Sequence, residues 1–175
     1  MSSKLPEEAA RIVGEVDRHN YFAHSIRDIQ KAIFQLKNGL RYHIYTHLTD
    51  VGRDTAIVFN RHFGGCDIIL SYQHEDSKEA DIRIALAHEL GHLVREIDNL
   101  ENMDGICDYS VEEEIFAWKF AFYLVREKSR IHKEDIERGK HIFTDTELRR
   151  SMSIALKGLK DPKVYETLKK DLVLP

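Results

Sequence analysis

The spacing of apolar and polar residues predicts two helices in the N-terminal part of the chain. Residues 6–17 and 25–37 both show helical patterning. Ser25 and Asp28 form a capping pattern at the start of the second helix, and Asn38-Gly39 is a typical helix end. We therefore expect the chain to begin with helices.

The next segment changes to the pattern of a small sheet. Residues 40–48 alternate between the two faces of a strand, and residues 55–60 and 68–72 follow as further short strands. Gly52 and Gly64-Gly65 separate these runs. Three strands are therefore expected.

Residues 77–96 carry the strongest helical pattern in the chain. This segment contains no proline and consists mainly of good helix formers. Asp76 or Ser77 can cap its start. One apolar stripe is formed by Leu86, Leu90, Leu93 and Ile97, and a second stripe beside it by Ala85, His88 and His92. Gly91 costs this helix about 1 kcal/mol relative to alanine, which indicates that another segment approaches closely there.

Helices are expected again in the C-terminal part. A helix over residues 110–128 buries a stripe of Ala117, Phe120, Ala121 and Leu124. Thr144 and Glu147 form a capping pattern for a further helix, and Asp161-Pro162 starts the last one. Helices, a small sheet and more helices predict a single α+β domain over residues 1–175, with the sheet packed against helices.

Composition indicates a globular protein of the cytoplasm. The chain has 175 residues, of which 42% are hydrophobic and 32% charged. It contains no apolar run long enough to cross a membrane, and residues 1–8 lack the apolar core of a signal peptide. Cys66 and Cys107 are therefore expected to be reduced thiols.

The charge balance argues against direct binding of nucleic acid. The net charge is −4, divided into −8 for residues 1–125 and +4 for residues 126–175. The basic C-terminal part could contact an acidic partner, but a solvated helical surface explains it more simply.

The helix over residues 77–96 contains the sequence His88-Glu89-Leu90-Gly91-His92. A spacing of four puts both imidazoles on one face of a helix, one turn apart, where they can share a metal ion. Glu89 then lies beside a metal-bound water without being a ligand. This is the arrangement of zinc-dependent peptide hydrolysis.

A third ligand is expected from the start of the next helix. The buried stripe of that helix, extended back by one turn, reaches Glu113 and Glu114 but not Glu112. Ser110 and Glu113 fit a capping box, which gives Glu113 a structural role. Glu114 is therefore the preferred ligand, and Glu113 is the reserve.

Two stretches resemble the ImmA/IrrE family of zinc metallopeptidases. They are Ile84-Ala85-Leu86-Ala87-His88-Glu89-Leu90-Gly91-His92 and Glu114-Ile115-Phe116-Ala117-Trp118-Lys119-Phe120-Ala121. The resemblance covers about residues 55–125. Trp118 departs from the family's asparagine, and Val125-Arg126 stands where the family has Met-Pro.

The resemblance implies a gluzincin-like enzyme with a zincin-like core. His88, His92 and Glu114 would hold one zinc ion, and Glu89 would be the general base. It also implies a cytosolic bacterial or phage-related endopeptidase whose substrate is a protein, often a helix-turn-helix repressor. The resemblance does not identify the substrate, and fold and motif alone do not fix a target.

Two other functions use the same residues. If His62 or Cys107 filled the fourth metal position, the chain would be a metal-stabilised regulatory or binding module without proteolytic activity. The same zinc could instead deacylate a small amide.

Substrate-binding residues are not defined by the sequence. His62 follows a strand end and Tyr109 precedes the second ligand helix, so each is a candidate for stabilising the transition state. His43, Tyr45 and His47 share one strand face, which we expect to be half-exposed.

Overall fold

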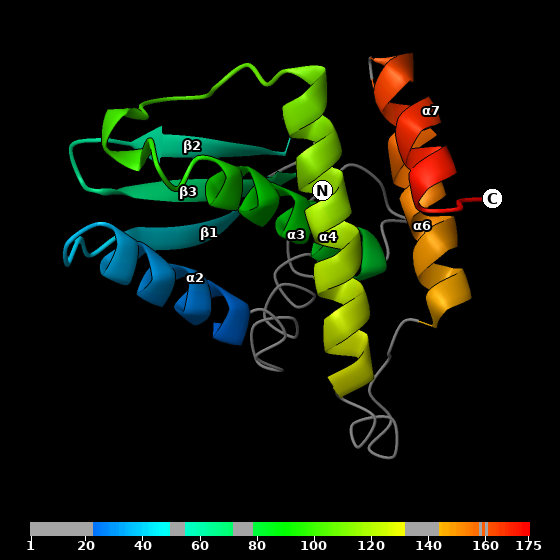
Figure 1. Cartoon of the computed structure of the whole chain (residues 1–175), viewed down its shortest axis with the longest axis horizontal. Coiled ribbons are helices and arrows are strands. Elements are labelled where there is room, and N and C mark those ends of the chain that lie inside the picture. The colour runs from blue at the N-terminus through cyan, green and yellow to red at the C-terminus, as the bar shows by residue number, and fades with distance from the viewer. Residues whose placement is uncertain (1–22, 50–54, 72–78, 132–143, 158, 160) are drawn as a thin grey trace, which may run out of the picture.

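The computed structural model describes residues 23–49, 55–71, 79–131, 144–157, 159 and 161–175 (Figure 1). The helix expected over residues 6–17, Gly52 and the cap at Asp76 or Ser77 lie outside them. The elements are α2 (Ala23–Leu36), β1 (His43–Thr49), β2 (Ala56–Asn60), β3 (Gly65–Ser71), α3 (Glu79–Arg95), α4 (Val111–Ile131), α6 (Asp145–Lys157) and α7 (Pro162–Asp171). This order confirms the expected α+β class.

The sheet is mixed, with its three strands in the order β1-β3-β2. β2 and β3 form an antiparallel hairpin, whereas β1 pairs with β3 in parallel. The last of the described strands is therefore the central one. This topology leaves β2 at an edge of the sheet.

β3 begins at Gly65, so the expected start at residue 68 was wrong by three residues. A Cβ atom on Gly65 would lie 2.5 Å from the carbonyl oxygen of His43, the residue with which Gly65 is in register. Close pairing with β1 therefore requires glycine at this position. Gly64, with a φ of +58°, makes the turn that precedes the strand.

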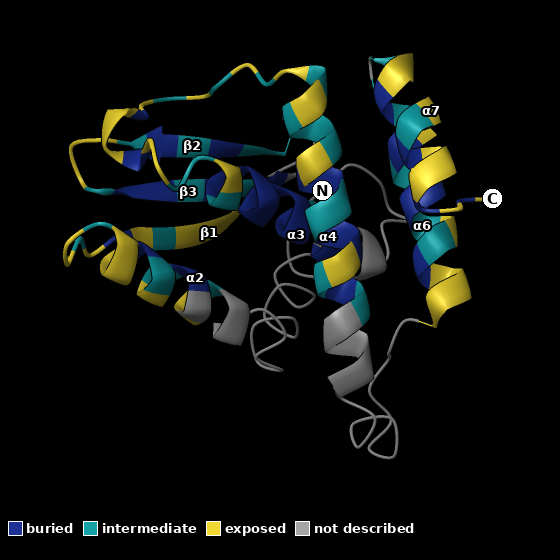
Figure 2. Cartoon of the chain, in the orientation of Figure 1, coloured by how far each residue is buried: buried dark blue, intermediate teal, exposed yellow. Residues whose placement is uncertain are grey.

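The two faces of the sheet differ in burial. Its inner face is formed by Ile57, Phe59, Cys66, Ile68 and Leu70, which are all buried. α3 packs against β2 and β3 and is buried along most of its described length, whereas β1 is largely exposed (Figure 2). His43, Tyr45 and His47 are exposed, as expected for a half-exposed strand face.

α2 begins at Ala23, before the expected start. Ser25 therefore lies inside the helix, and the prediction that it caps the helix start was wrong. A capping pattern in the sequence does not mark the start of a helix when the residues before it are also helical. The end was predicted correctly, because Asn38 and Gly39 have φ values of +50° and +89°.

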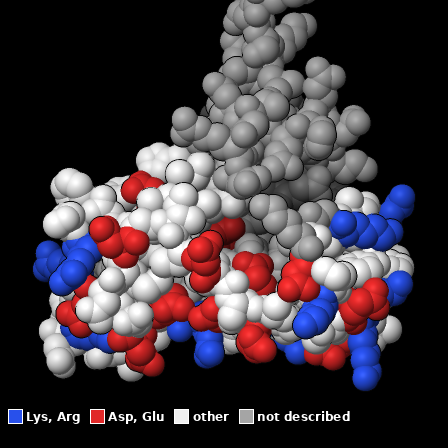
Figure 3. Space-filling view, turned by 90° about the horizontal axis from the view of Figure 1, so that it is seen from above, with Lys and Arg blue, Asp and Glu red and all other residues white. Residues whose placement is uncertain are grey.

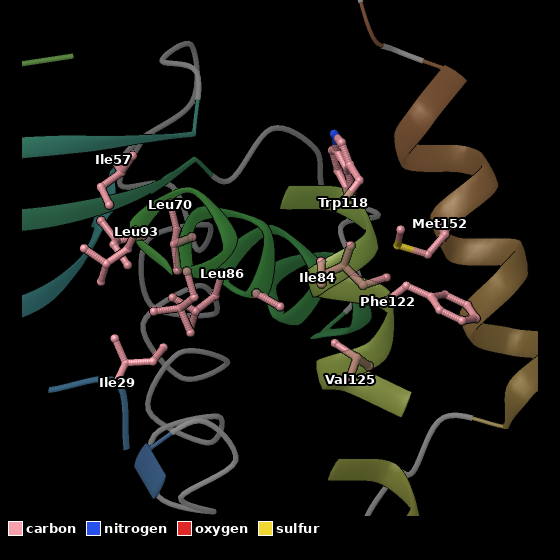
Figure 4. Close-up of a cluster of buried hydrophobic side chains, with 14 of the residues drawn as sticks. Ile29, Ile57, Leu70, Ile84, Leu86, Leu93, Trp118, Phe122, Val125 and Met152 are labelled. Atoms are coloured by element: carbon pink, nitrogen blue, oxygen red, sulfur yellow. The ribbon is translucent and has the colours of Figure 1, made fainter. Parts of the chain in front are cut away.

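The C-terminal helices pack against α4 on the side away from the sheet (Figure 1). Phe122 of α4 points toward the helix that carries Met152, and both side chains are buried (Figure 4). The expected caps are present. Thr144 and Glu147 exchange backbone-to-side-chain hydrogen bonds before α6, and the Asp161 side chain accepts from the backbone N–H of Lys163 at the start of α7.

The described helices and the two cysteines agree with the predictions made from composition about membrane spans and free thiols. None of these helices combines the length and apolar character needed to cross a bilayer. Cys66 and Cys107 are both free, as expected. On the face seen in Figure 3, acidic side chains lie across the middle and Lys and Arg mostly near the ends, so no continuous basic stripe is visible there.

α3 and α4 approach each other closely at Gly91 and Ala117. A Cβ atom on Gly91 would lie 2.7 Å from Cα and 2.8 Å from the carbonyl oxygen of Ala117. Both atoms belong to the backbone and cannot move as a side chain can. The close approach expected from a mid-helix glycine is therefore confirmed.

Replacing Gly91 with alanine should destabilise the protein. Helix propensity alone would stabilise it by about 1 kcal/mol, whereas forcing a methyl group against the backbone of α4 should cost more than that, about 3 kcal/mol. The expected net loss is about 2 kcal/mol in the free energy of unfolding, measured with urea. A stabilised Gly91→Ala variant would show that the helices can separate freely.

Candidate metal centre

α3 brings its two histidines together at the side of the helix that faces α4. His88 and His92 are both buried, and their Nε2 atoms lie 3.0 Å apart. Because the two residues are one helical turn apart, both rings can direct the same nitrogen toward one point. This is the pairing predicted from their spacing.

The first turn of α4 adds Glu114 to this pair. Its Oε1 lies 3.3 Å from Nε2 of His92, and its Oε2 lies 3.5 Å from Nε2 of His88. These three side chains form a group whose donor atoms all lie within 4.8 Å of one another. The structure therefore contains a possible metal site.

Glu113 has a different role, in the helix cap. The backbone N–H of Ser110 donates to Glu113 Oε2 at 2.7 Å, and the backbone N–H of Glu113 donates to Ser110 Oγ at 3.3 Å. This is the reciprocal capping box expected from the sequence. With Glu113 held at the helix start, Glu114 is left to face the histidines.

The donor set fits a tetrahedral metal ion. Donors about 2.0–2.1 Å from such an ion lie about 3.3 Å from one another, close to the observed separations of 3.0, 3.3 and 3.5 Å. Burial, and secondly the neighbouring His92, lowers the pKa of His88 well below its ordinary value. His88 is therefore neutral near pH 7, as a metal ligand must be.

The group of possible ligands has three members among the described residues, and neither His62 nor Cys107 belongs to it. His62 is exposed and does not line the pocket beside the group, whereas Cys107 does line it. Three protein ligands leave one tetrahedral position for water or a substrate.

Aromatic rings cover both histidines. The Trp118 ring lies 4.1 Å from that of His88, and the Tyr109 ring is stacked on His92 at 3.7 Å with an interplanar angle of 12°. The Nδ1 atoms of both histidines are buried without a hydrogen-bond partner among the described residues. Ring contacts therefore hold these imidazoles in place.

Trp118 is buried in the core and also contacts His88, a contact that was not predicted from the sequence. It follows Glu114 by four residues, so both lie on the same face of α4. This spacing is the signal that could have placed it beside the site. Tyr109 was a weak candidate, and the structure brings it to the site.

Glu89 lies beside the histidines in the wall of the pocket. The carboxyl group is buried and is hydrogen-bonded by the backbone of Ile57 in β2. Burial, followed by the charge of Glu114, raises its pKa to about 8. The site thus has a carboxyl group that can bind or release a proton near neutral pH.

The pocket has a volume of about 500 Å³. Besides the three possible ligands and Glu89, its wall contains Thr55, Ala56, Ile57, Ile69, Ile106, Cys107 and Tyr109. Ile106, Cys107 and Tyr109 come from the loop after α3, so this loop borders the pocket. The sheet contributes Ala56, Ile57 and Ile69, which the sequence alone did not single out.

Comparisons with protein-family models, curated proteins and solved structures found no match to this chain. The resemblance to the ImmA/IrrE peptidases therefore rests on residues 84–92 and 114–121 alone and stays a prediction. The functional evidence is the geometry of the site.

Replacing Glu114 with alanine should weaken the binding of a divalent ion such as Zn²⁺ by more than about 100-fold, because loss of even an indirect ligand partner costs 10–100-fold. Trp118 is the chain's single tryptophan and touches His88, so its fluorescence should report a metal titration.

Glu113→Ala is the matched control for this titration. It should keep the metal affinity and lose only about 1 kcal/mol of stability with the helix cap. An equal loss of metal affinity in both variants would contradict the assignment of Glu114.

Proposed function

We propose that this protein is a zinc-dependent endopeptidase. The observation that carries the proposal is the convergence of His88, His92 and Glu114 at one pocket that also contains Glu89. Two imidazoles and one carboxylate are a ligand set of catalytic zinc sites. The helix with both histidines packs under a small sheet, which supports the expected zincin-like core.

Glu89 is the general base in this proposal. A zinc ion held by His88, His92 and Glu114 would lower the pKa of a bound water to about 7 and would polarise the scissile carbonyl. Glu89 accepts a proton from the attacking water as the water oxygen bonds to the carbonyl carbon. It then passes the proton to the amine nitrogen as the C–N bond breaks. A nearby cation lowers the pKa of a carboxyl group, so metal loading favours the basic form of Glu89.

The substrate backbone binds in an extended form beside β2. This strand lies at the sheet edge, and its residues Ala56 and Ile57 line the pocket. Phe59 is bonded through both its backbone groups to Gly105, which covers the far part of that edge. Ile57 faces the same edge by strand alternation. Its N–H is bonded to Glu89, and its carbonyl oxygen can accept from the N–H of an added peptide, which would hold that peptide next to Glu89.

Tyr109 stabilises the developing oxyanion. Its hydroxyl is buried, has no hydrogen-bond partner among the described residues and belongs to a side chain that lines the pocket. Burial raises its pKa above the ordinary value, so the hydroxyl stays protonated and can donate. A donor aimed at the substrate oxygen is the usual means of stabilising this transition state.

The resemblance to the ImmA/IrrE family suggests the class of substrate. A cytosolic regulatory protein, such as a helix-turn-helix repressor, fits this class. An adjacent gene for such a regulator would name the first protein to test.

Changing Glu89 to glutamine should leave one zinc ion per chain bound and lower the cleavage rate by about 10²–10⁴-fold, the range for loss of a general base. The assay is the appearance of new termini in a peptide library, with zinc measured in the same samples. Fully retained proteolysis would refute the mechanism. Hydrolysis of small amides without any peptide cleavage would favour the deacylase.

Changing Tyr109 to phenylalanine should lower kcat by about 10²–10³-fold with little change in KM. Stability should stay equal or rise, because the lost hydroxyl has no partner.

Tyr42→Phe is the control for this variant. The Tyr42 hydroxyl donates to the Gly65 carbonyl oxygen at 3.0 Å. Its loss should destabilise the protein by about 1–3 kcal/mol and leave kcat unchanged. An unaltered kcat in Tyr109→Phe would exclude Tyr109 from the reaction.

A further inference from the structure

The two sides of the pocket differ in chemistry. The side formed by α3 and α4 carries His88, His92, Glu89 and Glu114. The other lining residues come from β2, β3, the residue before β2 and the loop after α3, and most of them are apolar. Pockets that bind small groups commonly combine an apolar wall with a few converging polar groups.

We propose that this apolar wall, formed by Ala56, Ile69 and Ile106, is a specificity subsite for an apolar side chain of the substrate. The inference rests on the proposed peptidase function and names its substrate class: an extended polypeptide with an apolar residue beside the scissile bond. The shape and the charge of this wall determine which type of side chain the subsite binds.

Ala56 and Ile69 form the floor of the subsite. They are register partners on neighbouring antiparallel strands, so their side chains stand next to each other on the face of the sheet opposite the one that packs on α3. An extended substrate beside β2 directs alternate side chains to this face. Both are partly buried. The small side chain of Ala56 leaves space beside Ile69 that an incoming side chain can fill.

Ile106 forms the rim. It is 70% exposed, an unfavourable state for a large aliphatic side chain that lines a pocket. Two contacts hold the backbone just before Ile106. Gly105 is paired with Phe59, and the Asp104 carboxylate accepts a hydrogen bond from the backbone N–H of Arg61. A bound apolar side chain would cover Ile106 without requiring the loop to move.

Charge also favours an apolar residue. No Lys or Arg is present in the described pocket wall, so an acidic side chain would be buried without a cationic partner. Glu89 and Glu114 face the metal position, where a divalent ion would balance their two charges. A basic side chain would therefore gain no counter-ion.

Paired hydroxamates test the subsite directly, since both bind zinc and only their side chains differ. N-acetyl-leucine hydroxamate should bind the zinc-loaded protein at least about tenfold more tightly than N-acetyl-aspartate hydroxamate, as burial of an aliphatic side chain predicts. Calorimetry measures both affinities without any need for turnover. Equal affinities would overturn the inference.

Ile106→Asp should remove most of the leucine preference. Ile154→Asp is the matched control, because Ile154 is 60% exposed on α6 and does not line the pocket. An identical effect of both substitutions would overturn the role of Ile106.

The peptide library separates this inference from the proposed function. Cleavage sites enriched in apolar residues would support both. Cleavage without such enrichment would overturn the inference and keep the peptidase. A leucine preference in hydroxamate binding without any peptide cleavage would support the subsite and overturn the proposed function.

Discussion

The contact between Gly91 and Ala117 determines the geometry of the whole site. Gly91 lies between the two histidines of α3, and Ala117 follows Glu114 by three residues on α4. Because backbone meets backbone there, the histidine nitrogens and the glutamate oxygens lie 3.3–3.5 Å apart. Any larger residue at position 91 would move the third ligand away from the first two. The metal position therefore depends on helix packing as much as on the ligands themselves.

Local signals predicted most of the elements but not their arrangement. The caps at Ser110, Thr144 and Asp161 were found because each depends on residues within three positions. The parallel pairing of β1 with β3 joins segments about twenty residues apart, and no local pattern specifies it. Gly65 was assigned to a turn for the same reason. Position 65 must lack a side chain because β1 lies so close to it, and the local sequence does not reveal that contact. The start of α2 was misplaced because Ser25 matches a cap in sequence alone.

The candidate site divides in the same way. His88, His92 and Glu114 could be predicted, because helical spacing and a capping box determine which side chains face inward. The apolar wall could not, since Ala56 and Ile69 come together through strand pairing. Tyr109 reaches His92 through the path of a loop, and loop paths are poorly encoded by local sequence. Trp118 was within reach of sequence reasoning, through its spacing from Glu114.

The single bridge between Phe59 and Gly105 has a consequence for the behaviour of the protein in solution. Open strand edges invite pairing with other chains, and proteins usually cover or shorten them. Here the bridge closes one end of β2 and stops at the pocket. The uncovered part of β2 is short and lies at the pocket, where a single short segment could pair with it. The position of this loop contact therefore covers part of the β2 edge and leaves the part at the pocket open to a peptide.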